Sequence, residues 1–229
     1  DPTGAATQQV FVRDTCRGAP WGCSASTVQA SVANDGSPGN GANLDAAISA
    51  DGRFVAFSSG SSNLVLGDTN GFEDVMLRDT CAGAPVGCTP STTRVSVATD
   101  GTQGDYLSAW PTISANGRFV AFYSEASNLV PDDTNGSGDA FVRDTCFGAP
   151  AGCVPSTIRV SVANDGSQGP YGGGIPSISA TGRFVAFESD VLPGFTGWGI
   201  FVRDTCAGAP AGCTPSTTLV SVANDGSWP

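Results

Sequence analysis

The sequence lacks two kinds of residue on which much enzyme chemistry depends, since none of its 229 residues is a histidine or a lysine. Nucleophilic triads and Schiff-base chemistry therefore have no obvious base or amine. Glutamate is nearly as scarce, and Glu73, Glu125 and Glu188 do not form the repeated carboxylate pair that a glycosidase would use. Carboxylate-only catalysis stays open, but these absences favour a protein that is not an enzyme.

Positive charge is also scarce, because ten arginines face 21 acidic residues and give a formal net charge of −11. The sequence pI is near 4.1. Phosphate backbones and anionic membranes are poor partners for such a chain, so we predict no nucleic-acid partner. No apolar run of about 18 residues and no signal peptide occurs, so we predict no membrane insertion and expect a mature, soluble, exported chain.

Turn-forming residues and small β-forming residues are abundant instead. The chain holds 31 glycines and 15 prolines beside many serines, threonines and valines. This composition suits numerous short strands joined by tight turns, and it gives helices little support. We therefore predict an all-β fold.

Eight cysteines form four pairs, with six residues between the members of each pair. Each pair follows Arg-Asp-Thr and encloses a Gly-Ala-Pro-x-Gly loop. This even, local spacing predicts four disulfides in an oxidising compartment, and hence a secreted, extracellular or periplasmic protein. A zinc site is the alternative, but zinc sites usually have closer Cys-x2-Cys spacing or include histidine. The predicted disulfides are Cys16–Cys23, Cys81–Cys88, Cys146–Cys153 and Cys206–Cys213.

A second repeated element is an apolar strand, a turn and another apolar strand. In its first copy, Ala46–Ala50 is followed by Asp51-Gly52 and then by Arg53–Ser58. An Asp-Gly pair between apolar runs predicts a two-residue hairpin with a type I′ turn, which requires positive φ. Both faces of the Arg53–Ser58 strand are apolar, so we expect both to be covered.

These elements recur at Ile48, Ile113 and Ile178 with a period of 65 residues, and each full unit contains four predicted strands. Four antiparallel strands per repeat, covered on both faces by neighbours, describe the blade of a β-propeller. A two-sheet sandwich is the alternative, but sandwiches do not repeat at this fidelity. We predict one repeat domain over residues 1–229, made of a half blade (1–36) and three blades (37–101, 102–166 and 167–229).

The first full unit also resembles a known repeat. Its residues 48–57, Ile-Ser-Ala-Asp-Gly-Arg-Phe-Val-Ala-Phe, are followed by Asn63–Val65, Asp68–Gly71 and Asp74–Asp79. The pattern resembles the WD40-like, TolB-type β-propeller repeats of bacterial proteins, many of which are exported. This resemblance covers nearly the whole chain and implies the propeller fold, but such repeats occur in scaffolds, binding proteins and enzyme accessory domains alike. The Cys loop between the third and fourth strands departs from the family's shorter blade.

The strand count comes to about three and a half blades, because the chain begins with a third and a fourth strand. That count does not close a ring of the usual four to eight blades. Either the chain belongs to a longer polypeptide, or chains complete one another, since unpaired blade edges invite strand pairing between subunits. Two chains could form a ring of roughly seven blades, whereas head-to-tail pairing that does not close would give a fibre.

A repeated set of oxygen-bearing side chains is the best candidate for a metal site. Alternating Asp and Asn oxygens on a glycine-containing turn, followed by a later carboxylate, suit Ca²⁺. The alternative is that these residues only shape the turn that leads into the next strand. No complete EF-hand spacing is present, and the third unit lacks the segment. The candidate ligands are Asp68, Asn70, Asp74, Asp133, Asn135 and Asp139.

Four tryptophans, Trp21, Trp110, Trp198 and Trp228, could stack on sugars, although large aromatics more often fill gaps between blades. We predict a secreted, non-enzymatic structural or interaction protein that associates with itself through open blade edges, into a ring-completing oligomer or a fibre. The alternative is a calcium-dependent propeller that binds a ligand such as a glycan. The Cys loops, repeated once per blade, are expected to form a repeated contact surface.

Overall fold

The structure is a computed structural model that describes residues 7–18, 21–190, 197–225 and 227. Within these residues the chain forms strands, turns and bends but no helix, which confirms the all-β prediction. The strands are β1 (Phe11–Asp14), β2 (Ser26–Gln29), β3 (Asn43–Ile48), β4 (Phe54–Ser59), β5 (Asp74–Asp79), β6 (Ser91–Arg94), β7 (Ser108–Ile113), β8 (Phe119–Ser124), β9 (Asp139–Asp144), β10 (Ser156–Arg159), β11 (Ser177–Ile178), β12 (Phe184–Ser189), β13 (Gly199–Asp204) and β14 (Ser216–Leu219).

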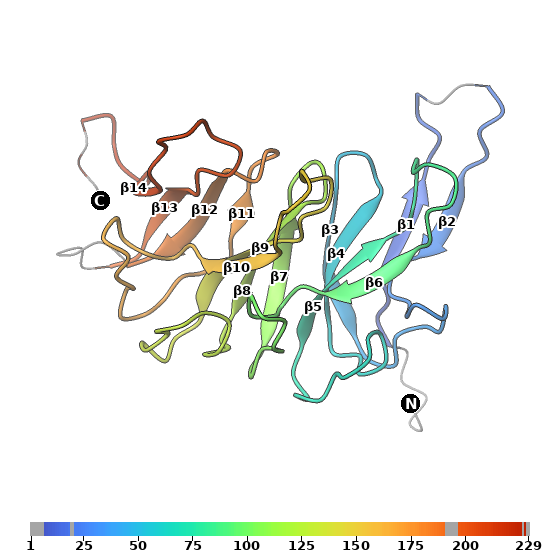
Figure 1. Cartoon of the computed structure of the whole chain (residues 1–229), viewed down its shortest axis with the longest axis horizontal. Helices are drawn as coiled ribbons and strands as arrows, with labels where there is room; N and C mark the ends of the chain where they lie inside the picture. The colour runs from blue at the N-terminus through green and yellow to red at the C-terminus, as the bar shows by residue number, and fades with distance from the viewer. Residues whose placement is uncertain (1–6, 19–20, 191–196, 226, 228–229) are drawn as a thin grey trace.

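The strands form a two-stranded sheet followed by three four-stranded antiparallel sheets (Figure 1). We call the β1-β2 sheet the half-blade. The sheets β3-β4-β5-β6, β7-β8-β9-β10 and β11-β12-β13-β14 are blades 1, 2 and 3. The half-blade contains the third and fourth strands of a repeat, as predicted, and the described part of the chain does not close into a ring.

The apolar core lies between neighbouring blades. All six residues of β4 are buried, as the apolar character of both its faces predicts. Phe54 on one face packs with residues of blade 2 such as Phe122. Val55 and Phe57 on the other face pack with Val10 of the half-blade. Each blade is therefore stabilised by its neighbours, so a blade at the end of the array has one uncovered face.

The hairpin between the first two strands of blade 1 differs from the predicted type I′ turn. Gly52 has a φ of +75°, but Asp51 is not among the residues with positive φ. The Gly52 amide donates to the Ser49 carbonyl at 2.9 Å, and the Ser49 amide donates to the Phe54 carbonyl at 2.9 Å. The type I′ prediction is wrong because Asp51 Oδ1 accepts bonds from the Ser49 hydroxyl and the Arg53 amide, which stabilise a right-handed turn closed by one left-handed glycine.

The same glycine is where successive blades meet. A Cβ on Gly117 would overlap the ring of Phe54 in the preceding blade, and a Cβ on Gly182 would overlap the ring of Phe119. The equivalent Gly52 in blade 1 has open space around that position. Close approach therefore requires glycine in blades 2 and 3, whereas in blade 1 only the backbone conformation favours it.

Candidate functional site

Each repeat carries a Cys loop that a disulfide closes between the third and fourth strands, and all four predicted disulfides are confirmed. The Cα atoms of each pair lie 5.8 Å apart, and none of the eight cysteines, all of which the structure describes, is free. The zinc alternative fails because no thiolate is left to bind a metal. The first cysteine of each loop has positive φ, between 55° and 61°.

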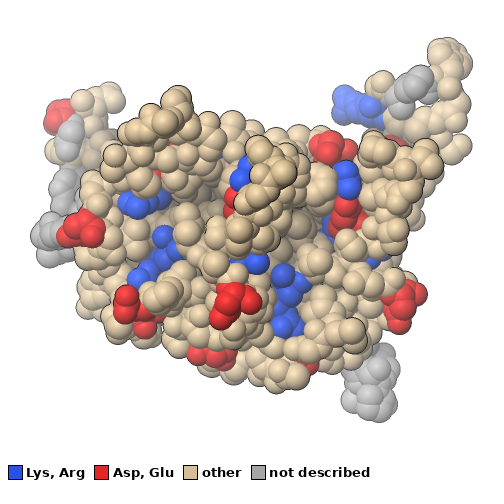
Figure 2. Space-filling view, in the orientation of Figure 1, with Lys and Arg blue, Asp and Glu red and all other residues tan. Residues whose placement is uncertain are grey.

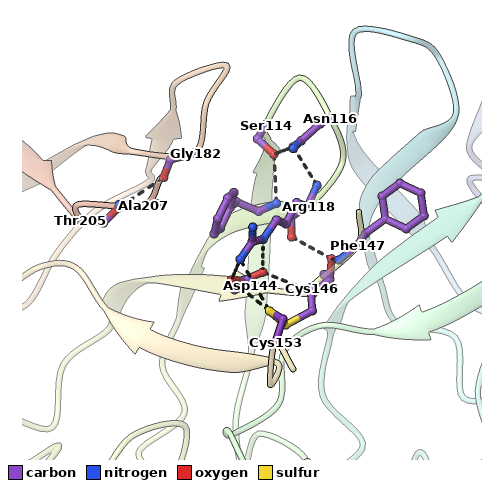
Figure 3. Close-up of polar contacts among 12 residues, drawn as sticks. Ser114, Asn116, Arg118, Asp144, Cys146, Phe147, Cys153, Gly182, Thr205 and Ala207 are labelled. Carbon is purple, nitrogen blue, oxygen red and sulfur yellow. Dashed lines mark hydrogen bonds and ion pairs between the residues drawn. A yellow bond between two sulfur atoms is a disulfide. The ribbon is translucent and has the colours of Figure 1, made fainter. Parts of the chain in front are cut away.

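An arginine directly before the second strand holds the Cys loop of each blade. In blade 2, Arg118 donates from Nε and Nη2 to the two carboxylate oxygens of Asp144, at 2.8 and 2.6 Å (Figure 3). Asp144 Oδ1 also accepts the amide of Cys146 at 2.8 Å. The two-point contact fixes the loop to the hairpin beside it. The other blades repeat this ion pair as Arg53–Asp79 and Arg183–Asp204.

The carboxylate of each Cys loop also lies close to the two sulfurs, in a group that resembles a metal-ligand set. The sulfurs are bonded to each other, and in blades 1 to 3 an arginine binds the carboxylate. In blades 1 to 3, neither kind of atom is therefore available as a strong ligand. We assign these groups the role of holding the loop in place.

The aspartates predicted to bind calcium gather around arginines instead of an open space. Arg94 Nε lies 3.0 Å from Asp74 Oδ2, and Arg94 Nη2 lies 3.3 Å from Asp68 Oδ1. The guanidinium occupies the position between the carboxylates and supplies the positive charge that a bound cation would supply. Blade 2 repeats the cluster with Arg159, Asp133 and Asp139.

Two of these carboxylates, Asp74 and Asp139, are fully buried. Burial raises the pKa of each to about 6, because loss of water outweighs the serine hydroxyl and the arginine that lower it. The serine bonds are short, with Ser96 Oγ 2.7 Å from Asp74 Oδ1 and Ser161 Oγ 2.5 Å from Asp139 Oδ1. Burial also raises the pKa of Asp133.

The two asparagines of the predicted sites contact the connection into the next blade. Asn70 and Asn135 donate from Nδ2 to the carbonyls of Gly104 and Gly169, each at 3.0 Å. The structure thus brings the two carboxylates of each repeat together and ties the asparagine to the following connection. Calcium binding stays a prediction, and calorimetric titration of the wild type and of Asp68→Ala tests it.

Sequence reasoning missed that the aspartates predicted to bind calcium pair with arginine, although the repeats contain the signal of this pairing. In the half-blade, Gln9 stands at the position of Asp74 and Gln29 at the position of Arg94. Gln29 Nε2 donates to Gln9 Oε1 at 2.9 Å. Aspartate thus occurs with arginine, glutamine occurs with glutamine, and the two positions change together. Blade 3 has Gly199 and Leu219 there.

Neighbouring blades are joined at their outer strands by hydrogen bonds that we call the clasp. Thr92 of β6 donates from its amide to Asn34 Oδ1 at 2.6 Å and from Oγ1 to the Val32 carbonyl at 2.5 Å. Each blade thereby donates to the loop that follows the outer strand of the preceding one. The same contact joins Thr157 to Val97 and Thr99, and Thr217 to Val162 and Asn164. An arginine adds a bond in two of these contacts, Arg143 to the Ala98 carbonyl and Arg203 to the Ala163 carbonyl.

At each end of the array, one half of the clasp has no inter-blade partner within the described part of the chain. Thr27 of β2 stands at the position of Thr92, which is 1% exposed, but Thr27 is exposed. Val222 and Asn224 stand at the accepting positions after β14, and both are exposed. Figure 1 shows β2 and β14 at opposite ends of the array. One end therefore donates and the other accepts.

The three tryptophans that the structure describes do not form one binding platform. Trp21 is fully exposed in the first Cys loop, Trp198 is exposed just before β13, and Trp110 of β7 packs on the ring of Tyr123 with centroids 5.3 Å apart. Trp228 lies outside the described residues. Stacking on a sugar by several tryptophans together is therefore not supported.

A polar hollow of about 560 Å³ lies where the connections into β7 and β11 approach each other. Tyr106 and Tyr171 offer exposed rings there. Glu125 supplies a carboxylate, and its Oε1 accepts the Tyr123 hydroxyl at 3.1 Å. Glycine and serine of the Gly136–Gly138 turn complete the lining. This hollow, rather than the tryptophans, combines aromatic faces with hydrogen-bonding groups.

Antiparallel four-stranded blades side by side define a propeller-type fold that is open rather than closed within the described residues. No protein-family model matches the chain, and no curated protein matches its sequence. Solved structures match, among them a TolB-type protein from Agrobacterium tumefaciens at 16% identity and a TM-score of 0.43, over 91% of this chain and 59% of that one.

Two further matches are similar in extent. TolB from Acinetobacter baumannii has 13% identity and a TM-score of 0.30, over 87% of this chain and 47% of that one. Hydrazine synthase from Kuenenia stuttgartiensis has 15% identity and a TM-score of 0.39, over 91% of this chain and 51% of that one. The chain thus spans less than two thirds of each. The four-stranded antiparallel blades that the TolB-type resemblance implies are present in the structure, and TolB-type structures are among the matches. The disulfide-closed loop in each repeat is the departure from that pattern that the sequence predicts.

The described residues contain no helix of sufficient length and apolar character to cross a bilayer. Figure 2 shows arginine side chains lying among acidic side chains across the face in view.

Proposed function

We propose that the protein is an exported, non-enzymatic interaction propeller that associates with itself head to tail through the clasp. The observation that carries this proposal is the repetition of one inter-blade contact along the chain, with its donor half exposed at one end and its acceptor half exposed at the other. Four disulfides support an oxidising compartment, and we propose a secreted or periplasmic location.

In the proposed contact, the half-blade of one copy packs against blade 3 of the next. Thr27 donates from Oγ1 to the Val222 carbonyl and from its amide to Asn224 Oδ1, as Thr92 and Thr217 do with their partners within the chain. Arg13 donates to the Ala223 carbonyl, as the equivalent arginines of blades 2 and 3 do. The contact continues an interface that the chain already contains.

Apolar side chains surround these polar bonds at both ends. Within the chain, Phe141 of blade 2 packs in one cluster with Val75 and Val95 of blade 1. Phe11 stands at the position of Phe141 and is 58% exposed. The proposed contact places Phe11 against exposed Ile200 and Val220 of blade 3, which stand at the positions of those two valines. Burying them supplies the hydrophobic part of the association.

The contact is heterologous, since two different surfaces meet. Successive copies therefore form a ring if the rotation closes and a fibre if it does not. Two copies carry the same two strands in their half-blades, so neither supplies the first and second strands that the other lacks. A ring of complete blades needs those strands from another source.

Size-exclusion chromatography with light scattering tests the proposal. We expect species larger than the 23.0 kDa monomer at high protein concentration, and their loss in Thr27→Val and Asn224→Ala. Thr93→Val changes the same kind of side chain on β6 outside the clasp and is the control. A strictly monomeric wild type at high concentration would refute self-association.

A second candidate function is glycan binding at the polar hollow between blades 2 and 3. Tyr106 and Tyr171 provide faces on which a sugar ring can stack, and Glu125 can accept its hydroxyl groups. Titration with a panel of oligosaccharides, followed by NMR, is expected to give saturable shifts that Tyr106→Ala and Tyr171→Ala abolish. Trp21→Ala, which alters an exposed ring in a Cys loop, is the control. Equal loss in the control would contradict this candidate.

A further inference from the structure

The polar hollow between blades 2 and 3 has a filled counterpart between blades 1 and 2. In that earlier contact, the ring of Phe72 packs against the ring of Tyr106, with centroids 4.3 Å apart. One repeat later, Tyr171 stands at the position of Tyr106, but Ser137 stands at the position of Phe72. Both Tyr171 and Ser137 line the hollow. The hollow therefore lies where the preceding repeat has a phenyl ring.

The backbone around the two places makes the same bonds. Asn70 and Asn135 each donate to a carbonyl of the next connection at 3.0 Å, and their Oδ1 atoms accept the amides of Phe72 and Ser137, also at 3.0 Å. The carbonyls directly before β5 and β9 each accept an amide from the following blade, at 2.8 and 2.9 Å. Serine in place of phenylalanine thus removes a side chain while the surrounding backbone contacts stay the same.

A neighbouring difference between the two contacts is compensated, whereas this one is not. Gly138 stands at the position of Glu73, and a Cβ on Gly138 would overlap the hydroxyl of Tyr123. Tyr123 stands at the position of Ser58, so a larger side chain on β8 fills the space that the smaller residue before β9 leaves. Ser137 has no such compensation, because it lines the open hollow. Tyr171 is accordingly 68% exposed.

The lining determines the chemistry of a ligand. Glu125 is the one charged residue among the described residues that line the hollow, and its side chain is exposed. Burial, together with the nearby Glu125 carboxylate, raises the pKa of Tyr123 to about 12, so its hydroxyl stays a neutral donor to Glu125. Two tyrosine rings beside one carboxylate suit a ring that carries a positive charge.

We propose that the hollow binds one hexosamine ring with a free amino group, stacked on Tyr171 in the place that Phe72 takes on Tyr106. The ammonium group donates to Glu125, and the ring hydroxyls bond to the Gly136–Gly138 turn. This inference rests on the glycan-binding candidate stated above, and it adds the position and the charge of the bound ring. Sugars that carry a carboxylate are disfavoured, since Glu125 and the net charge of −11 repel them.

Three methyl glycosides that differ at one substituent test the charge preference: the β-glucosaminide, the β-glucoside and the β-glucuronide. We titrate each by NMR at mildly acidic pH, where the amine is protonated. The glucosaminide should bind about threefold or more tighter than the glucoside, and the glucuronide should bind weakest. Glu125→Gln should make the glucosaminide and the glucoside equal. Glu188→Gln, which changes an exposed glutamate of β12 outside the hollow, is the matched control and should keep the preference.

Ser137→Phe tests the position of the ring, because it restores the side chain that the preceding repeat has. The new ring should pack on Tyr171 as Phe72 packs on Tyr106 and weaken binding of the glucosaminide about tenfold or more. The melting temperature of this variant should equal or exceed that of the wild type. Ser24→Phe makes the same substitution at an exposed serine after the first Cys loop and should leave binding unchanged.

The outcomes separate this inference from the glycan-binding candidate. Undiminished binding by Ser137→Phe, a melting temperature of that variant well below the wild type, or equal affinity of the wild type for glucosaminide and glucoside would overturn the inference alone. The loss of oligosaccharide binding in Tyr106→Ala and Tyr171→Ala would still support the candidate in those cases. No shift with any glycoside or oligosaccharide would overturn both.

Discussion

A single pair of positions in each repeat shows how the chain accommodates polar groups inside its core. Asp74 is buried beside Arg94 in blade 1, whereas the half-blade uses Gln9 beside Gln29. Blade 3 places glycine and leucine there. A buried charge needs a partner, a buried amide needs a hydrogen bond, and apolar groups need neither. Each combination satisfies its own requirement, so an exchange of one member alone should be costly.

Replacing Arg94 by glutamine tests whether the buried carboxylate of Asp74 depends on its arginine partner. Arg94→Gln leaves the buried carboxylate of Asp74 without its nearest cation, so we expect the free energy of unfolding to fall by about 3 kcal/mol. Adding Asp74→Gln should recover most of this loss, since two glutamines can bond as Gln9 and Gln29 do. Denaturant unfolding of both variants measures the difference. A double variant no more stable than the single one would show that the arginine is not the carboxylate's essential partner.

The same carboxylates should shape the dependence of stability on pH. The pKa of Asp74 and of Asp139 is raised to about 6 from an ordinary 3.8, so the folded protein binds more protons than the unfolded chain between these values. Their contribution to stability is therefore greatest below about pH 4 and is lost as the pH rises through 6, by up to about 3 kcal/mol for each.

Carboxylates with a lowered pKa act in the opposite sense. The pKa of Asp79 is lowered because the bonds from Arg53 and from the Cys81 amide together outweigh burial, which raises it. The contribution of Asp79 to the stability of the fold is present above the ordinary pKa of aspartate and is lost in stronger acid. Stability should thus rise from pH 7 to pH 5 and fall below about pH 4. Urea unfolding across this range should show a smaller rise in Asp74→Asn, but an unchanged rise in Asp35→Asn.

At the scale of the hairpin element, one glycine position tests how blades are packed together. Gly117 and Gly52 have nearly the same φ, +76° and +75°, but only Gly117 lies against a ring, that of Phe54. Alanine at either position adopts a strained backbone, at about 1 kcal/mol. Gly117→Ala also forces the ring to move, so its total cost should exceed that of Gly52→Ala by about 1–3 kcal/mol. Thermal unfolding compares the two, and equal losses would contradict this packing.

The elements were predictable because each one repeats and each has a local cause. Alternating faces predict the strands, and evenly spaced cysteines predict the disulfides. Contacts between elements were harder to predict, since Asp79 binds Arg53 on a neighbouring strand rather than the adjacent Arg78, and only the strand register determines that choice. The turn at Asp51 was mispredicted because a side chain stabilises it. Comparison of equivalent repeat positions would have shown the aspartate–arginine pairing.

At the scale of the whole molecule, an open array of blades has two unlike ends. Every internal blade is covered on both sides, so the end surfaces expose residues whose equivalents are buried, such as Phe11 and Val222. The chain gives these ends complementary hydrogen-bonding groups in Thr27 and Asn224. The same repetition that builds the fold therefore also provides the surfaces for the association that we propose.

Charge opposes this association. Each copy carries a formal net charge of −11, so two copies repel each other in dilute salt. The proposed contact pairs Phe11, Arg13 and Thr27 with uncharged groups of blade 3, so it contains no pair of opposite charges that salt would weaken. Salt screens the repulsion over about 10 Å at 0.1 M and leaves apolar burial intact. Raising sodium chloride from about 20 to about 300 mM should therefore strengthen association several-fold, as sedimentation velocity can measure. Thr27→Val should stay monomeric at every salt concentration, and association that weakens with salt would indicate a contact held by opposite charges instead.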